Sequence, residues 1–144
     1  MTNGSPRVVI VDDHAASLPV FAALIQPEFS VVGTAKNGQD ALAVVGELHP
    51  DVVILDIEMP VMDGLLAARL LLDSDPAARI VFLTACADPD YLEAALNLGA
   101  LGYVWKPRAA LDLPTAIRSA MLGAWFASPG TFDSGHRSGP YPVD

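Results

Sequence analysis

Short apolar runs alternate along the chain with segments in which apolar residues recur at helical spacing. The apolar runs are residues 8–11, 31–35, 52–55, 80–83 and 101–105. A run of four or five apolar residues without polar alternation is typical of a strand buried on both faces of a parallel sheet. The pattern therefore predicts an α/β fold, a doubly wound five-stranded parallel sheet with five helices on its two faces.

Capping residues and prolines predict where the helices begin. Pro19 is tolerated only in a first turn, so the first helix should begin near Ser17. Asn37 is expected to cap the second helix and Asp88 the fourth. For the last helix we expect Asp112 as the cap, with Pro114 again in the first turn and Leu113, Ala116, Ile117 and Ala120 facing inward.

Composition limits the class of protein. Hydrophobic residues make up 52% of the 144 residues and charged residues 17%, which favours one globular domain. We expect a flexible start at 1–6, a folded domain at 7–123 and a disordered tail at 124–144, which is rich in Pro, Gly and Ser. No apolar stretch approaches the roughly 20 residues that a membrane span needs.

Charge and cysteine content limit the cellular compartment and the binding partners that we expect. The formal net charge is −9 and the eight basic residues are scattered, which is unfavourable for nucleic-acid binding. The single cysteine, Cys86, excludes an internal disulfide and fits a reducing compartment. The start lacks the basic and apolar regions of a signal peptide. We therefore expect a cytoplasmic protein that binds neither membrane nor nucleic acid.

Polar side chains follow four of the predicted strands at the points where those strands end. They are Asp12 and Asp13, then Asp56, Thr84 and Lys106. The carboxyl ends of strands in such a sheet share one edge, so these side chains should converge. Three carboxylates within about 5 Å repel one another by roughly 3 kcal/mol per pair, and one lysine cannot neutralise them. An acidic site of oxygen ligands suits Mg²⁺.

A carboxylate beside Mg²⁺, a lysine and a hydroxyl is arranged for phosphoryl transfer. Asp56 would be the nucleophile that forms an acyl phosphate, while Mg²⁺ and Lys106 neutralise the transferring group. The alternative for a lone aspartate after a strand is a solvated loop carboxylate. The matching residues at the other strand ends argue against that alternative.

Four motifs carry a resemblance to a known family. They are Val-Asp-Asp, Leu-Asp-Ile-Glu-Met-Pro-Val-Met-Asp-Gly, Leu-Thr-Ala and Gly-Tyr-Val-Trp-Lys-Pro, in this order. Together, over about residues 7–122, they resemble the response-regulator receiver domain of two-component signalling. The resemblance implies a flavodoxin-like fold with strand order 2-1-3-4-5. The chain is further similar to receivers that carry a helix-turn-helix output domain, yet it stops where that domain would begin, so we expect a receiver standing alone.

The resemblance implies roles for residues of the catalytic and metal site. Asp56 matches the phospho-accepting aspartate, and Asp12 and Asp13 match the acidic pair that binds Mg²⁺ together with it. Glu58 would give the metal its backbone carbonyl. Lys106 matches the lysine that contacts the phosphoryl group, and its bond to Pro107 resembles one that is cis in the family.

Two further residues match the family's switch. Thr84 matches the hydroxyl that hydrogen-bonds the phosphoryl group, and Tyr103 the aromatic that turns inward when the threonine moves. The implied partners are a sensor histidine kinase or phosphotransfer protein, and a downstream protein on the face of the fourth helix, fifth strand and fifth helix. The resemblance also allows a phosphorylation-dependent homodimer. Trp105 departs from the family, since a smaller aliphatic residue is usual before the lysine.

Two other functions remain open at this point. An Mg²⁺-dependent hydrolase working through an aspartyl phosphate would need a general acid, for which Glu58 is the candidate. A receiver-like module that binds partners without phosphorylation is disfavoured by the acidic cluster. We expect a signalling receiver that catalyses only its own phosphorylation and dephosphorylation. The sequence does not identify the kinase, the output partner or the phosphoryl lifetime.

Overall fold

A computed structural model describes residues 4–86 and 88–130. The strands are β1 (Arg7–Val11), β2 (Ser30–Ala35), β3 (Val52–Leu55), β4 (Ile80–Thr84), β5 (Gly102–Trp105) and β6 (Phe126–Ala127). The helices are α1 (Ser17–Ile25), α2 (Gly38–Leu48), α3 (Gly64–Ser74), α4 (Pro89–Leu98) and α5 (Ala109–Met121), with a 3-10 turn, η1 (Lys106–Arg108), before α5. All strand pairs are parallel, in the order β2-β1-β3-β4-β5-β6. The predicted α/β class and the order of the first five strands are confirmed.

The sheet has a sixth strand that the sequence did not predict. β6 lies inside the predicted disordered tail, 124–144, and pairs with the outer edge of β5. The Phe126 N–H donates to the Leu101 carbonyl (3.0 Å) and the Ser128 N–H to the Tyr103 carbonyl (2.9 Å). Apolar side chains before and within β6 pack on both cores, so this part of the tail is folded. Residues 131–144, like 1–3, lie outside the described residues.

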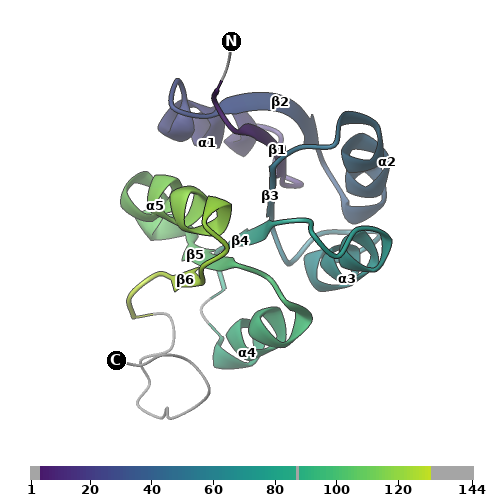
Figure 1. Cartoon of the computed structure of the whole chain (residues 1–144). Coiled ribbons are helices and arrows are strands. Elements are labelled where there is room, and N and C mark those ends of the chain that lie inside the picture. Colours follow the sequence, from purple (N-terminus) through teal and green to yellow (C-terminus); the bar gives the residue numbers. More distant parts are fainter. Residues whose placement is uncertain (1–3, 87, 131–144) are drawn as a thin grey trace.

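The helices cover both faces of the sheet (Figure 1). α1 and α5 pack on one face, and α2, α3 and α4 on the other. β1, β3 and β4 are buried on both faces, which explains their unbroken apolar sequences. The carboxyl ends of these strands are therefore held at one rigid edge.

Two helix starts follow their predicted caps and one does not. The Asn37 side chain accepts the Asp40 N–H (2.8 Å), and Asp88 caps α4 in the same manner. The prediction for the last helix was wrong, because η1 runs directly into α5 at Ala109. Asp112 is instead buried inside the helix and pairs with Arg108 (Nε–Oδ2 2.7 Å), and Pro114 falls in the second turn.

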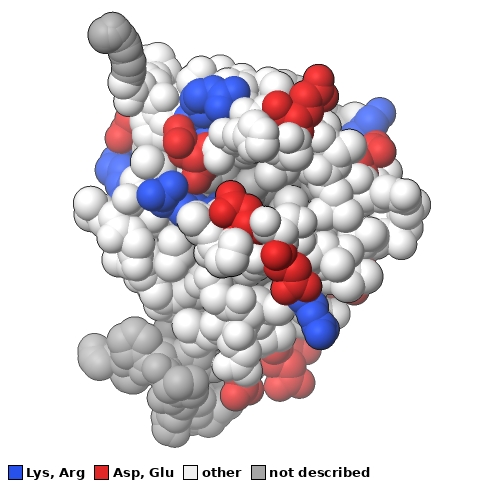
Figure 2. Space-filling view, turned by 45° about the vertical axis from the view of Figure 1, so that its right-hand side comes forward, with Lys and Arg blue, Asp and Glu red and all other residues white. Residues whose placement is uncertain are grey.

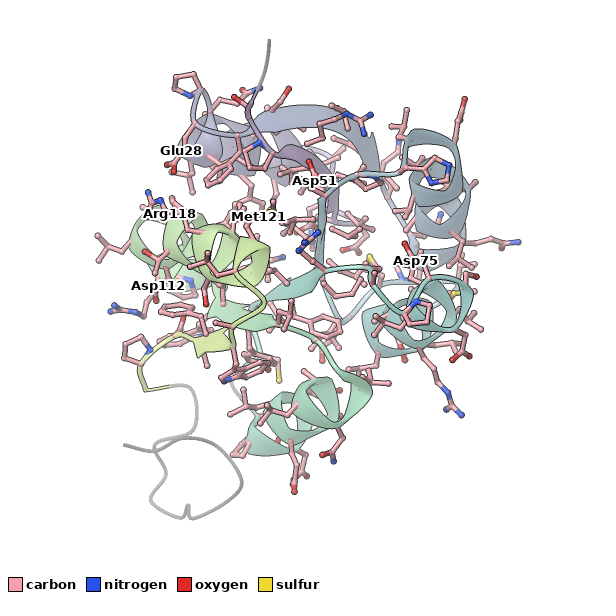
Figure 3. The ribbon with its side chains drawn as sticks, in the orientation of Figure 1. Glu28, Asp51, Asp75, Asp112, Arg118 and Met121 are labelled. Atoms are coloured by element: carbon pink, nitrogen blue, oxygen red, sulfur yellow. The ribbon has the colours of Figure 1, made fainter. Side chains whose placement is uncertain are left out.

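An ion pair joins α5 to the loop between α1 and β2, as Figure 3 shows. Arg118 donates to both carboxylate oxygens of Glu28, at 2.7 and 2.9 Å. Both side chains are about half exposed, so water and salt screen the pair and it adds little to stability. It lies on the side of the molecule that carries α1 and α5. Among the described helices, none is both long and apolar enough to cross a membrane.

Candidate functional site

Asp12 and Asp56 lie side by side where β1 and β3 end. The two strands are in register, Val11 opposite Leu55, and the Asp56 N–H donates to the Val11 carbonyl (3.0 Å). Both side chains are almost completely buried, 1% exposed for Asp12 and 6% for Asp56. Burying two carboxylates together is costly unless a cation pairs with them.

Lys106 bridges these two carboxylates from the end of β5. Its Nζ lies 2.8 Å from Asp12 Oδ2 and 3.1 Å from Asp56 Oδ2, and it packs over the Phe21 ring at 5.8 Å. The other oxygen of Asp56, Oδ1, accepts the Ile57 N–H at 2.7 Å. Both oxygens of Asp56 are thereby held in fixed directions.

The environment shifts the pKa of both partners. Burial raises the pKa of Asp56 above its ordinary value, and the Lys106 ammonium opposes this only in part. Burial alone would lower the pKa of Lys106, but its contacts with Asp12 and Asp56 raise it instead. Lys106 is therefore a fixed positive charge, and the edge as a whole keeps an excess of carboxylates.

The acid pair has oxygens that the protein leaves without hydrogen bonds. Asp12 Oδ2 meets Lys106 as an ion pair without hydrogen-bond geometry, and Asp13 Oδ1 is buried with no hydrogen-bond partner among residues 4–86 and 88–130. The His14 Nδ1 lies 3.3 Å from Asp13 Oδ1 and 3.5 Å from Asp12 Oδ1. These three residues hold their ligand atoms within 4.8 Å of one another. Buried carboxylate oxygens without donors fit a hard divalent cation such as Mg²⁺.

Glu58 and Asp13 line one pocket beside this edge. The pocket has a volume of about 410 Å³, and its other walls include Met59, Pro60 and Tyr91. The Glu58 side chain is exposed, so it does not join the buried carboxylates. The structure thus places Glu58 in the wall of the same pocket as Asp13, close to the acid pair.

Thr84 and Tyr103 meet at Cys86 and not at Asp56. Thr84 is buried at the end of β4, where its Oγ1 accepts the Cys86 N–H at 3.1 Å. The Tyr103 hydroxyl donates to the Cys86 carbonyl at 2.8 Å, and its ring is fully buried. Burial raises the pKa of the Tyr103 phenol. Both side chains predicted to form the switch therefore hold one loop, between β4 and α4.

A family model described as the response regulator receiver domain matches residues 8–118. The chain belongs to this family. A transcriptional regulatory protein of Bacillus subtilis, YvfU, is 38% identical over 125 residues, which cover 85% of this chain and 62% of the relative. The response regulator GacA of Pseudomonas aeruginosa is 36% identical over 125 residues, 85% of this chain and 58% of its own length.

Solved structures agree with the assignment. A LuxR-family two-component response regulator from Aurantimonas superposes with a TM-score of 0.83 at 31% identity, covering 88% of this chain and 91% of that one. The isolated receiver of RcsB from Salmonella, in the presence of the phosphomimetic BeF₃⁻, gives 0.80 at 28% identity, covering 90% and 96%. The receiver spans about three fifths of YvfU and GacA. Because relatives are named as transcriptional regulators, the expectation of no nucleic-acid binding is not confirmed.

The peptide bond after the lysine corrects one expectation. Among the described residues of this receiver, the cis peptide bond is Gln26–Pro27, and Lys106–Pro107 is trans. Lys106 begins the 3-10 turn η1, whose second residue is Pro107. The lysine nevertheless reaches both carboxylates from this backbone.

Two residues with structural roles at the receiver's site were missed from the sequence. Ser128 is completely buried, and its Oγ accepts the Trp105 N–H at 3.1 Å. Gly64 lies so close to the backbone of Asp56 that a Cβ there would be 1.9 Å from the Asp56 carbonyl oxygen. The Asp-Gly sequence indicated a loop, but the close approach needs the fold. Ser128 had no signal, because a serine in a Pro- and Gly-rich segment is ordinary.

Proposed function

We propose that this receiver acts in the cytoplasm, where it accepts a phosphoryl group on Asp56 from a sensor histidine kinase or phosphotransfer protein, with Mg²⁺, and so switches a protein-interaction surface. The observation that carries the proposal is the contact of Lys106 Nζ with both Asp12 and Asp56, beside a buried Asp13 oxygen that lacks a hydrogen bond. A carboxylate, a fixed ammonium and free carboxylate oxygens at one edge are the parts that aspartyl phosphorylation needs.

The reaction forms one bond and breaks one. A carboxylate oxygen of Asp56 attacks the phosphorus of a phosphohistidine, the P–N bond breaks, and its electron pair stays on the imidazole nitrogen. The Ile57 N–H holds Oδ1, which leaves Oδ2, beside Lys106, as the attacking oxygen. Lys106 then contacts the oxygens of the incoming group. Asp12, Asp13, Asp56 and the Glu58 carbonyl would hold Mg²⁺, which supplies positive charge at the transferring group when bound.

The output follows from the loop that Thr84 and Tyr103 share. If the Thr84 hydroxyl turns to a phosphoryl oxygen, it gives up the Cys86 N–H, and the loop that Tyr103 also holds is released. The surface of α4, β5 and α5 borders this loop and would bind the partner. On the face in Figure 2, several Lys and Arg side chains lie beside Asp and Glu side chains, and the basic groups form no continuous patch there. A protein partner, or a second phosphorylated copy, suits this surface better than nucleic acid.

Intact mass after incubation with a small acyl-phosphate donor, with and without Mg²⁺, tests the proposal. A stable gain of one phosphoryl group that needs Mg²⁺ supports the receiver. Release of inorganic phosphate without accumulation would indicate the hydrolase instead. No reaction under either condition would leave the non-phosphorylated binding module. Size-exclusion chromatography of the labelled protein then decides between monomer and homodimer.

Asp56→Asn should abolish phosphoryl uptake, because the amide cannot act as the nucleophile. The matched control is Asp63→Asn, since Asp63 lies nearby and caps α3, a task that asparagine performs equally well. The control should label at the wild-type rate. Labelling of the Asp56→Asn protein at that rate would place the nucleophile elsewhere.

A further inference from the structure

The strand that delivers Lys106 is held on its outer edge by residues that follow α5. On its inner edge, β5 pairs with β4, Thr84 opposite Trp105. On its outer edge, the Leu101 and Tyr103 carbonyls accept N–H groups from Phe126 and Ser128. The next polar group on that edge is the Trp105 N–H, where the backbone pairing with β6 has ended.

Ser128 extends the pairing by one bond with its side chain. Its N–H donates to the Tyr103 carbonyl (2.9 Å), while its Oγ accepts the Trp105 N–H (3.1 Å). One completely buried residue therefore bonds to both Tyr103 and Trp105, at the carboxyl end of β5. Loss of the hydroxyl would leave the partly buried Trp105 N–H without this acceptor, which is unfavourable.

Trp105 is the residue on which the position of Lys106 depends. It is the N-cap of η1, so the backbone changes there from extended to helical. Its indole Nε1 donates to the Ala85 carbonyl (3.2 Å), which fixes the side chain, and Ser128 fixes the backbone. The next residue, Lys106, must place Nζ within 3.1 Å of two carboxylates. A small displacement of a reacting group is enough to slow a reaction that depends on positioning.

We propose that Ser128 is a positioning residue for Lys106. It acts through the Trp105 backbone, and it ties the phosphoryl site to a segment that lies beyond the last helix. The inference rests on the proposed function of Asp56. It assigns Ser128 no contact with the phosphoryl group and no part in the chemistry itself.

Three variants test this role by the rate of phosphoryl uptake. Ser128→Ala should slow uptake by roughly three- to tenfold, the equivalent of one net hydrogen bond. Ser128→Thr keeps the hydroxyl and should restore most of the rate. The control is Ser119→Ala, because the Ser119 hydroxyl donates to the Ala124 carbonyl (3.0 Å) and so holds the same segment through a bond that does not involve β5. The control should stay within about twofold of wild type. Equal slowing by Ser119→Ala and Ser128→Ala would overturn the proposal.

A double-mutant cycle with Lys106→Ala separates positioning from general stability. If Ser128 acts through Lys106, Ser128→Ala should cause no further slowing in the Lys106→Ala background. The same fold-decrease in both backgrounds would show that Ser128 acts through the fold alone. If the background rate is too slow to time, the threonine rescue and the Ser119 control decide.

Amide exchange and NMR keep this inference separable from the proposed function. Should the wild-type protein take up no phosphoryl group, the proposed function fails, and the placement of Lys106 is still measurable. Ser128→Ala should speed exchange of the Trp105 N–H and shift the side-chain signal of Lys106, whereas Ser119→Ala should do neither. An unchanged Lys106 signal in the Ser128→Ala protein would overturn the positioning role.

Discussion

One lysine between two buried carboxylates leaves Asp13 as the uncompensated acid of the site. Lys106 contacts Asp12 and Asp56, whereas Asp13 Oδ1 lies 3.3 Å from the His14 imidazole and accepts no hydrogen bond from the described residues. Oxygen sites for Mg²⁺ do not need imidazole, so His14 is not required as a metal ligand although it lies beside the acid pair. At this scale the site is an anionic cavity whose charge is balanced only in part.

Asp13→Ala should therefore weaken Mg²⁺ binding by about tenfold or more. Loss of a residue that only hydrogen-bonds a metal ligand already has an effect of this size. Without metal, the variant should gain stability by less than about 1 kcal/mol, because Asp13 is partly exposed and its repulsion is screened. Titration of Mg²⁺ and urea denaturation measure the two effects. Asp73→Ala, which changes the charge equally on α3, is the control, and equal Mg²⁺ affinity of both variants would contradict the site.

The pKa of Asp56 gives a prediction for stability against pH. Because burial raises this pKa in the folded protein, the folded state binds a proton at a pH where the unfolded state has lost it. Asp56 therefore costs stability increasingly as the pH rises from its ordinary value, 3.8, through the raised one. Asp56→Asn should be more stable than wild type at pH 7 without metal, and the difference should shrink toward pH 4. Thermal denaturation at both pH values checks this, and a constant difference would contradict it.

At the scale of helices and strands, the junction between β3 and α3 depends on a glycine, Gly64, which lets α3 lie close to the backbone of Asp56. The first residue of α3, Gly64, lies against the Asp56 carbonyl and donates its N–H to the Ile57 carbonyl (2.7 Å). The start of the helix is thus packed directly against the backbone of Asp56. Any side chain at this position must push the two apart.

Gly64→Ala should cost about 2–3 kcal/mol of stability, as overpacking does, and should slow phosphoryl uptake because the Asp56 backbone must move. The control is Gly46→Ala in the last turn of α2, where an added Cβ meets no atom within 4 Å. That variant should gain about 0.5–1 kcal/mol, since alanine favours helix. Urea denaturation of both proteins measures the contrast. A fully stable Gly64→Ala protein would show that the junction can relax.

Elements with local signals were predictable and those with non-local causes were not. β1, β3 and β4 are apolar because both faces are covered, and Asn37 and Asp88 cap helices with their own side chains. β6 has two residues and exists because the β5 edge offers hydrogen-bond partners, which no local pattern records. The early start of α5 likewise follows from η1, and not from its own caps.

At the scale of the molecule, phosphorylation should be visible at a tryptophan. Trp105 and Tyr103 bond to the loop after β4 at Ala85 and Cys86, and Thr84 holds the same loop at Cys86. A ligand that draws Thr84 away shifts the balance between loop conformations by its differential contact with each. Trp125→Phe, which leaves Trp105 as the sole tryptophan, should therefore change fluorescence when beryllium fluoride and Mg²⁺ are added.

Two controls accompany the fluorescence measurement. Thr84→Ala in the same background should blunt the change while beryllium fluoride still binds. Trp105→Phe, which leaves Trp125, should respond weakly. A flat Trp105 signal, with binding shown by an independent method, would mean that the switch runs through another surface.

The convergence of the site was predictable, while its bonding was not. Strand-end residues must meet at one edge, so Asp12, Asp56 and Lys106 followed from the pattern. Loop conformations, which the order of strands and helices does not determine, decide two other features. They are the hydrogen bond between Thr84 and Cys86 and the trans bond between Lys106 and Pro107. The resemblance to the receiver family implied a cis peptide bond between Lys106 and Pro107, and this chain does not adopt it.

Because of the sixth strand, the folded unit extends beyond the end of the family-model match. The family match ends at residue 118, whereas β5 is still being paired at Ser128. A recombinant fragment ending at residue 123 would leave the Leu101 and Tyr103 carbonyls and the Trp105 N–H on an open sheet edge, which invites intermolecular pairing and aggregation. Engineers who graft this module onto other proteins, as a sensor or in a chimera, should therefore keep Ser128 and place the junction beyond it.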